Sequence, residues 1–416
     1  MPVIETIITQ HAEEISFLWL LRGKAVHAPH YSLKDLAKLD NRVEAHIDGL
    51  RVAGDAGWEI CKEFLGAGEA GEVFAAAVLA FESSDEERIR MVIEVAEEKP
   101  ETCRGLVSAL GWLSWQEVEI HIRKLLAAES LPLHRAGLAA CVAHRQDPGT
   151  PLIDALRNDD PVVRAQALQT VGELGRKDLI PFLQDNMTSE DDLCRYSAAW
   201  STALLGDMGK ASAAVLKPFV TMNFSRRKDA MKIALRRMPP SSALELQAEL
   251  ASQPDTMRLA LIGAGVIGDP VLVPWLMERM MVPELARVAG ESFTMITGVD
   301  IAYEDLEGKK PEGFEAGPTE NPEDEDVSMD PDEDLPWPDP GLVPAWWARN
   351  KSALQDGARY LLGKPINLVN LQHVLRYGRQ RQRAAAAIEM AIMNPGQPLF
   401  ETRAPGFRQQ RILGLN

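Results

Sequence analysis

Residues 160–183 read DPVVRAQALQTVGELGRKDLIPFL, and this stretch decides the fold. Apolar residues recur in it at the spacing of one helical face, at Val163, Ala167, Leu168, Val171 and Leu174. Pro161 and Pro181 each suit the first turn of a helix, where the missing backbone N–H is not needed. Gly172 and Gly175 suit close helix packing and a helix end. The stretch predicts a helix, a tight turn and a second helix.

The same arrangement recurs along the chain, each time with an arginine followed by small and apolar residues. From Arg104 the successive intervals are 31, 29, 31, 32, 31 and 29 residues. The members of this arginine ladder are Arg42, Arg104, Arg135, Arg164, Arg195, Arg227, Arg258 and Arg287. The interval from Arg42 to Arg104 is two periods, and the missing unit is centred near Val73. Helix pairs that cannot bury their apolar faces alone must stack, so about nine units are predicted between residues 40 and 300.

This period and pattern resemble HEAT repeats, in the short form found in phycobilin-lyase-like proteins. The resemblance implies an all-α fold, an α-solenoid of HEAT-like helix-turn-helix repeats. We expect an N-terminal helical cap (1–40), the repeat solenoid (41–302), a flexible acidic, proline-rich loop (303–343) and a C-terminal helical region (344–416). Within that last region, residues 357–363 and 371–377 have helical spacing. The ladder arginines are expected to pair with carboxylates and helix-end carbonyls of the adjoining unit.

Residues 303–343, the acid-rich segment, hold most of the charge. They contain fifteen carboxylates against two lysines, which accounts for −13 of the net charge of −17. Such a composition buries too little apolar surface to order itself, so the segment is either a solvated linker or an interaction loop for a basic partner. Trp337, flanked by prolines, favours the interaction loop because buried aromatic residues dominate interface energies. The predicted partner-binding residues are Glu323, Asp324, Glu325, Asp326, Asp330, Asp332, Glu333, Asp334, Trp337 and Asp339.

Four arginines, at positions 376, 379, 381 and 383, cluster after this segment. They could bind the acid-rich segment within the chain or bind a partner, and we expect the first.

No pattern indicates catalysis, so we expect a protein that is not an enzyme and has no catalytic, metal-binding or cofactor-binding residues. The four cysteines are far apart in sequence, and we expect reduced, buried thiols. Residues 263–268 spell GAGVIG, which mimics a dinucleotide fingerprint but follows a helix rather than a strand. An acidic chain repels nucleic acid and anionic membranes. We therefore expect a protein partner, no nucleic acid and no membrane. Because no apolar run reaches the roughly 18 residues that span a bilayer, and the first residues lack a secretory pattern, we expect a cytoplasmic location.

Five stretches carry a narrower resemblance: residues 11–22, 50–54, 290–298, 359–363 and 397–401. They resemble a family of bacterial HEAT-repeat proteins encoded beside type VI secretion effectors. The resemblance implies an immunity protein that binds and neutralises a toxin effector, such as a nuclease with a basic face. The alternatives are a non-catalytic scaffold or adaptor for effector loading and, more remotely, a HEAT-like DNA glycosylase, which the acidic charge disfavours.

Overall fold

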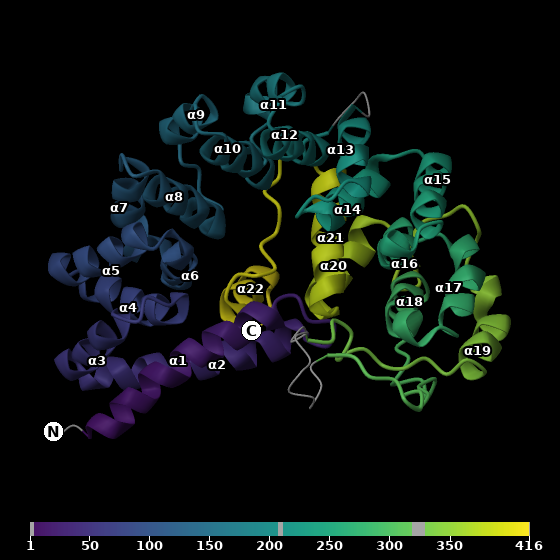
Figure 1. The fold of residues 1–416 in the computed structure, drawn as a ribbon, viewed down its shortest axis with the longest axis horizontal. Coiled ribbons are helices and arrows are strands. Elements are labelled where there is room, and N and C mark those ends of the chain that lie inside the picture. The colour runs from purple at the N-terminus through teal and green to yellow at the C-terminus, as the bar shows by residue number, and fades with distance from the viewer. Residues whose placement is uncertain (1–3, 207–210, 318–328, 416) are drawn as a thin grey trace. The chain divides into compact units, whose positions relative to one another are not determined.

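The computed structural model describes residues 4–206, 211–317 and 329–415, and these are mostly helical (Figure 1). The chain divides into a first unit, Met1–Gly206 with Ala391–Asn416, and a second unit, Asp207–Met390. The first unit contains α1 (Glu5–Ala25), α2 (Leu33–Ala53), α3 (Asp55–Leu65), α4 (Ala70–Ser83), α5 (Glu86–Glu98), α6 (Cys103–Trp112), α7 (Trp115–Leu126), α8 (Leu131–His144), α9 (Thr150–Leu156), α10 (Pro161–Glu173), α11 (Ile180–Asn186), α12 (Asp192–Leu204) and α22 (Gly406–Leu413).

The second unit contains α13 (Ala211–Thr221), α14 (Arg227–Arg237), α15 (Pro240–Ala251), α16 (Pro254–Ile267), α17 (Val273–Arg279), α18 (Pro283–Thr297), α19 (Leu342–Asn350), β1 (Tyr360–Leu361), β2 (Lys364–Pro365) and α20 (Leu368–Tyr377). Helix α21 (Gln380–Met393) crosses the boundary between the units, and short 3-10 turns lie at Pro100–Thr102, Lys177–Leu179, Pro270–Leu272 and Lys351–Ala353.

The repeat pattern produces the helices that it predicts. Asp160 caps α10 by accepting hydrogen bonds from the backbone N–H groups of Val162 (2.8 Å) and Val163 (3.0 Å). Gly175 ends the unit with a positive φ of 73°, a conformation that glycine adopts without a steric penalty. The helix, tight turn and second helix predicted for residues 160–183 are confirmed as α10 and α11.

The ladder marks alternate helices. Each member from Arg104 to Arg287 lies within the first five residues of its helix: α6, α8, α10, α12, α14, α16 and α18. These helices pack on one another in succession within each unit. The same contact recurs in both units: Ser201 donates to the Leu168 carbonyl and Ser292 to the Leu261 carbonyl, each at 2.7 Å. The all-α, HEAT-like solenoid architecture is confirmed.

The expected domain boundaries differ from those observed. Helix α2 runs through the expected end of the cap at residue 40, and α1 packs against α2 and α4 as part of the stack. The expected C-terminal region, 344–416, is divided, since residues up to Met390 belong to the second unit and those from Ala391 to the first.

Residues 357–363 were expected to be helical, and this is wrong. They enter a short antiparallel hairpin in which Tyr360 pairs with Pro365 and Leu361 with Lys364. The two residues at its turn, Leu362 (φ 52°) and Gly363 (φ 72°), are both in the left-handed region, which suits a two-residue hairpin turn. The hairpin lies against the ends of α16 and α18: the Tyr360 N–H donates to Gly268 O at 2.9 Å, and the Leu362 N–H donates to Met295 O at 2.8 Å.

Candidate protein-interaction surfaces

In the first unit the ladder arginines hold the turns between helices. Arg164 donates to the carbonyl oxygens of Asn158 (2.6 Å) and Asp159 (3.3 Å), in the turn after α9. Arg195 does the same one repeat later, to Ser189 (2.6 Å) and Glu190 (3.3 Å), and pairs with Asp192. These bonds go to turn carbonyls just before each arginine's own helix, and not to the carboxylates and helix-end carbonyls of the adjoining unit that the ladder predicts.

In the second unit the corresponding arginines hold the acid-rich segment. Arg258 donates through both terminal nitrogens to the carboxylate of Asp332, in one bond at 2.7 Å. Arg287 donates to the backbone carbonyl of Asp332 at 2.9 Å and to the carboxylate of Asp330 at 2.6 Å. The Asp332 hydrogen bonds raise the pKa of Arg258, so this cation stays charged beside its partner.

The two described arms of the segment, residues 303–317 and 329–343, also pair with each other. The Gly308 N–H donates to Trp337 O at 2.7 Å, and the Asp339 N–H donates to Leu306 O at 2.8 Å. The side chains of Leu306 and Leu335 are buried. These contacts form a stem that fixes both arms on the second unit.

Aromatic residues complete the stem. The guanidinium of Arg287 lies 4.4 Å from the ring centroid of Trp337 and 5.6 Å from that of Phe314. The two rings meet edge to face at 5.0 Å. Trp337 therefore stabilises the fold of its own chain.

Several predicted partner-binding residues make contacts within the chain. Asp332 is only 3% exposed, and the partly exposed Asp330 and Trp337 contact Arg287, so these three anchor the segment. Their binding to a partner stays a prediction. Asp339 accepts hydrogen bonds from the N–H groups of Gly341 and Leu342, both at 2.8 Å, at the start of α19. The expected flexible loop over 303–343 is wrong for both described arms, because ion pairs, buried leucines and an aromatic contact supply the order that composition alone does not.

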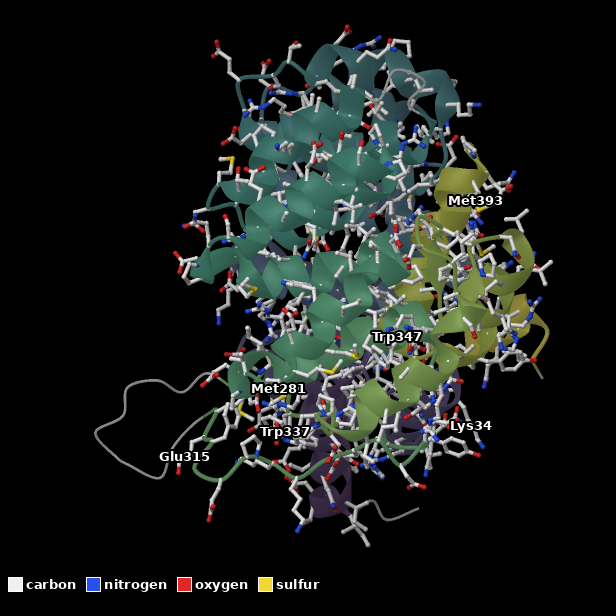
Figure 2. The ribbon with its side chains drawn as sticks, turned by 90° about the vertical axis from the view of Figure 1, so that its right-hand side faces the viewer. Lys34, Met281, Glu315, Trp337, Trp347 and Met393 are labelled. Carbon is white, nitrogen blue, oxygen red and sulfur yellow. The ribbon has the colours of Figure 1, made fainter. Side chains whose placement is uncertain are left out.

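Two of the other predicted residues are exposed. Glu333 and Asp334 are exposed beside the buried Asp332. Glu323, Asp324, Glu325 and Asp326 lie outside the described residues. Further exposed carboxylates surround the stem, at Glu304, Asp305, Glu307, Glu312 and Glu315. Figure 2 labels Glu315 and Trp337 on this segment. The stem thus holds its anchoring residues by contacts within the chain, with Asp332 buried, and presents other carboxylates to solvent.

One surface of the first unit is covered by the chain's own C-terminal residues. Helix α22 packs against α2, where the Gly406 N–H donates to the buried Asp40 carboxylate at 2.5 Å (Figure 1). Arg408 donates to the Leu113 carbonyl at 2.8 Å, beyond the end of α6. Glu401 pairs with Arg145 at 3.1 Å. Burial opposes ionisation of Glu401, but the charges of Arg403 and Arg145 lower its pKa to about 2.

The second unit is covered in a similar way by its own later elements. The carboxylate of Glu389 on α21 accepts from Arg236 of α14 at 2.9 Å and from Arg359 at 2.6 Å. In the arginine cluster at 376–383, Arg381 pairs with Glu291 of α18 at 2.8 Å, and the buried Arg383 donates to Leu375 O at 2.8 Å. These faces of the repeats are therefore occupied by the chain itself.

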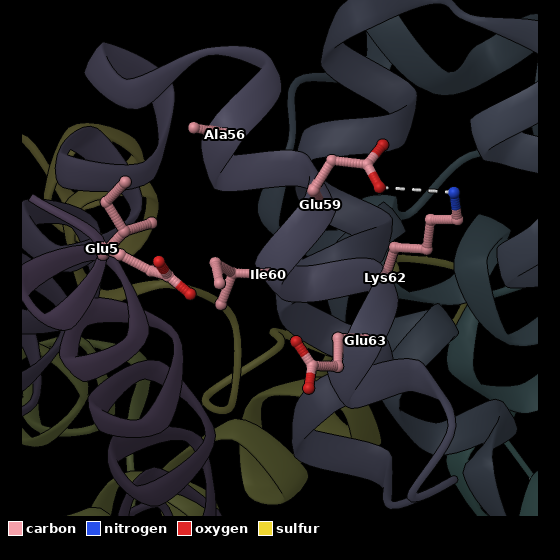
Figure 3. A pocket seen from close by; sticks show the side chains of 7 residues that line it. Glu5, Ala56, Glu59, Ile60, Lys62 and Glu63 are labelled. Carbon is pink, nitrogen blue, oxygen red and sulfur yellow. Dashed lines mark hydrogen bonds and ion pairs between the residues drawn. The ribbon is translucent and has the colours of Figure 1, made fainter. Parts of the chain in front are cut away.

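An open groove lies between the start of α1 and α3 (Figure 3). It is lined by Glu5, Ile8, Ala56, Glu59, Ile60, Lys62 and Glu63. Its one lysine is 3.3 Å from Glu59. The groove is acidic with an apolar floor, so its chemistry favours a cationic side chain over an anionic ligand.

The described residues hold little that resembles a reactive centre. Burial raises the pKa of Cys61 and of Cys141 to about 12 and that of Cys194 to about 11, which keeps these thiols protonated. Among the described residues, no group of three or more His, Cys, Asp or Glu side chains could hold a metal ion. In the GAGVIG stretch, a side chain at Gly263 or Gly265 would meet Leu235 or Ser292 at 3.1–3.2 Å. These glycines serve helix packing, and Gly268 ends α16.

The comparisons with known proteins agree with the fold. Residues 149–236 match the family model for HEAT repeats. No curated protein and no solved structure matches the chain. Within the described ranges, no helix has the length and apolar character needed to cross a bilayer. The chain therefore contains HEAT repeats in its central part, where the sequence pattern is strongest.

Sequence reasoning missed Arg258 and Arg287 as the binding site for the acid-rich segment. The ladder identified both arginines, but their partners lie 74 and 43 residues away in sequence. One feature of the sequence could have identified them: Arg258 and Arg287 are the ladder arginines nearest to the acid-rich segment. Phe314 was also missed, because it has no periodic pattern to mark it.

Proposed function

We propose that this chain is a non-catalytic scaffold that binds a basic protein through the carboxylates presented around the stem. The observation that supports the proposal is that some residues of the acid-rich segment anchor it while neighbouring carboxylates are exposed. Asp330, Asp332 and Trp337 fix it to the second unit, while neighbouring carboxylates such as Glu307, Glu315 and Glu333 stay exposed. A fixed acidic surface loses less conformational entropy on binding than a free loop does.

More specifically, we propose that the partner is a toxin effector such as a nuclease, that binding neutralises it, and that this happens in the cytoplasm. The support is the resemblance to type VI secretion-associated HEAT-repeat proteins together with charge. A nuclease grips phosphates with a basic face, and carboxylates can occupy the positions of those phosphates. An effector-loading adaptor would bind the same partner without blocking its activity.

The test is affinity capture from cells of the source organism, followed by kinetics with the purified partner. Wild type is compared with a variant in which Glu307, Glu312, Glu315 and Glu333 become lysine. The matched control reverses four exposed glutamates of α5: Glu87, Glu94, Glu97 and Glu98. We expect a basic partner whose association slows at least tenfold with the segment variant and hardly at all with the control. Equal binding by the two variants, or a partner with no basic face, contradicts the proposal.

A toxicity assay separates the two finer roles. Co-expression of an immunity protein restores growth of cells that produce the effector, and the segment variant does not. An adaptor leaves the effector toxic in both cases.

A further inference from the structure

Helix α1 carries an exposed stripe on the face that does not pack against α2 and α4. The stripe consists of Gln10, Glu13, Phe17, Leu20 and Lys24, all exposed. Their spacing of three or four residues places them in one line along the helix. Phe17 is 60% exposed and Leu20 is 51% exposed. Two large apolar side chains stand next to each other in solvent here, with a charged residue on either side.

This stripe is not the polar face that an amphipathic surface helix normally presents to solvent. Adjacent exposed apolar residues within a charged surface mark interaction sites more often than single ones do. The buried side of α1 already packs through Ile8, Ile15 and Leu18, so Phe17 and Leu20 are not needed for the core.

The order of residues in the stripe is self-complementary. Glu13 and Lys24 are equally far in sequence from the midpoint between Leu18 and Trp19, and so are Phe17 and Leu20. In two antiparallel copies of α1, each residue therefore faces its counterpart across that midpoint. Glu13 faces Lys24 of the second copy, and Phe17 faces Leu20. With a rise of about 1.5 Å per residue, the two charged contacts lie about 16 Å apart, with the apolar contacts between them.

Both charges are available for such a contact. Within the described ranges, neither Glu13 nor Lys24 takes part in an ion pair, and both are exposed. A contact in which residue i meets j and j meets i is what a twofold axis requires. A parallel arrangement would instead place Glu13 against Glu13 and Lys24 against Lys24.

We propose that α1 is a self-association surface, through which two copies of this chain form a twofold dimer with antiparallel α1 helices. This goes beyond the proposed function and does not depend on it, since the acid-rich segment takes no part. A single helix pair is small for a protein interface, so the dimer is weak, with a Kd on the order of 10–100 μM.

The experiment is analytical ultracentrifugation of the full chain from roughly 1 to 500 μM, a range that brackets this Kd. Phe17→Asp should abolish self-association. Glu13→Lys and Lys24→Glu should each raise the Kd about tenfold or more, because each turns two attractions into repulsions. Ile120→Asp, on an exposed apolar residue of α7 (63% exposed), is the matched control and should leave the Kd unchanged. Circular dichroism confirms that every variant remains folded.

Charge exchange tests the antiparallel geometry itself. The Glu13→Lys and Lys24→Glu variants, each of which associates weakly alone, should form a heterodimer with about the wild-type Kd when mixed. The double variant should recover the wild-type Kd. A wild-type chain that stays monomeric at all concentrations overturns the proposal, as does self-association that is insensitive to Phe17→Asp. Single-variant effects without recovery on mixing overturn the antiparallel arrangement. If α1 binds only a helix of another protein and the chain does not self-associate, the proposal that a second copy of this chain binds α1 is wrong.

Discussion

Arg164 and Arg195 in the first unit occupy the same position in the repeat as Arg258 and Arg287 in the second. The first pair donates to carbonyls of the turn that immediately precedes each helix. The second pair donates to Asp330 and Asp332, which belong to a segment inserted after the last repeat helix. One repeat position thus serves two purposes. In the first unit, an arginine near the start of a helix donates to the turn before that helix. In the second unit, the arginine at the same position binds the acid-rich segment.

The largest effect is expected at Arg287. Its side chain is 7% exposed, and it holds both Asp330 and the backbone of Asp332. Arg287→Ala leaves the Asp330 carboxylate without its cation and a cavity beside Trp337, and it should destabilise the second unit by about 3–5 kcal/mol. Urea unfolding followed by hydrogen exchange in α16 and α18 measures this. A loss of stability below about 1 kcal/mol would show that Arg287 contributes no more than the arginines that donate only to turn carbonyls.

Asp332→Asn should have the next largest effect, about 2 kcal/mol, because it keeps the shape but removes the charge opposite Arg258. The loss should appear mainly as faster hydrogen exchange and proteolysis between residues 329 and 343. Glu333→Gln, one residue along and exposed, is the matched control, with an expected change below about 0.5 kcal/mol. Equal protection in the two variants contradicts the assignment of Asp332 as the anchor.

We expect the stability of the first unit to fall at low pH because of His144. Burial lowers its pKa to about 4, and its ring Nε2–H donates a hydrogen bond at 2.7 Å to Leu110 O. The unfolded chain binds a proton below about pH 6.5 and the folded unit does not, so stability falls as the pH drops below that value. We expect a loss of about 1 kcal/mol between pH 7 and 5.5, reported by hydrogen exchange in α6 and α8. His144→Gln should remove this part of the pH dependence, and an unchanged pH profile would exclude His144 as its source.

The smallest effect is expected at Arg164, the first-unit counterpart of Arg287. Arg164→Ala removes hydrogen bonds to two partly exposed turn carbonyls that water can replace, so the cost is about 0.5–1 kcal/mol. Thermal unfolding of this variant beside Arg287→Ala sharpens the contrast between the two units. Similar losses at both positions would mean that the ladder has one role throughout.

Much of the fold could be predicted because the repeat is a local property. The ladder from Arg104 to Arg287 lies in the first five residues of successive alternate helices, and Gly175 ends its unit as expected. Helical periodicity, capping residues and glycine conformation all act within about ten residues. A single sequence therefore contains the information needed to place them.

The rest depended on contacts between distant residues. Composition predicts a solvated loop for residues 303–343, yet an arginine pair and two buried leucines anchor its described arms. The hairpin at 360–365 takes its order from Gly268 and Met295 at the ends of α16 and α18. The division of the C-terminal residues between the units has the same origin, since Glu401 pairs with Arg145 across 256 residues of sequence. The partner-binding role of the remaining carboxylates stays a prediction.

The most direct test of this account is the coupling free energy between Arg258 and Asp332 in a double-mutant cycle. Stability is measured for wild type, Arg258→Ala, Asp332→Ala and the double variant by urea unfolding of the second unit. An anchoring ion pair predicts a coupling of about 1–3 kcal/mol, so that the double variant loses clearly less than the sum of the single losses. Additive losses, with a coupling below about 0.3 kcal/mol, would contradict the claim that the arginine ladder of the second unit holds the acid-rich segment.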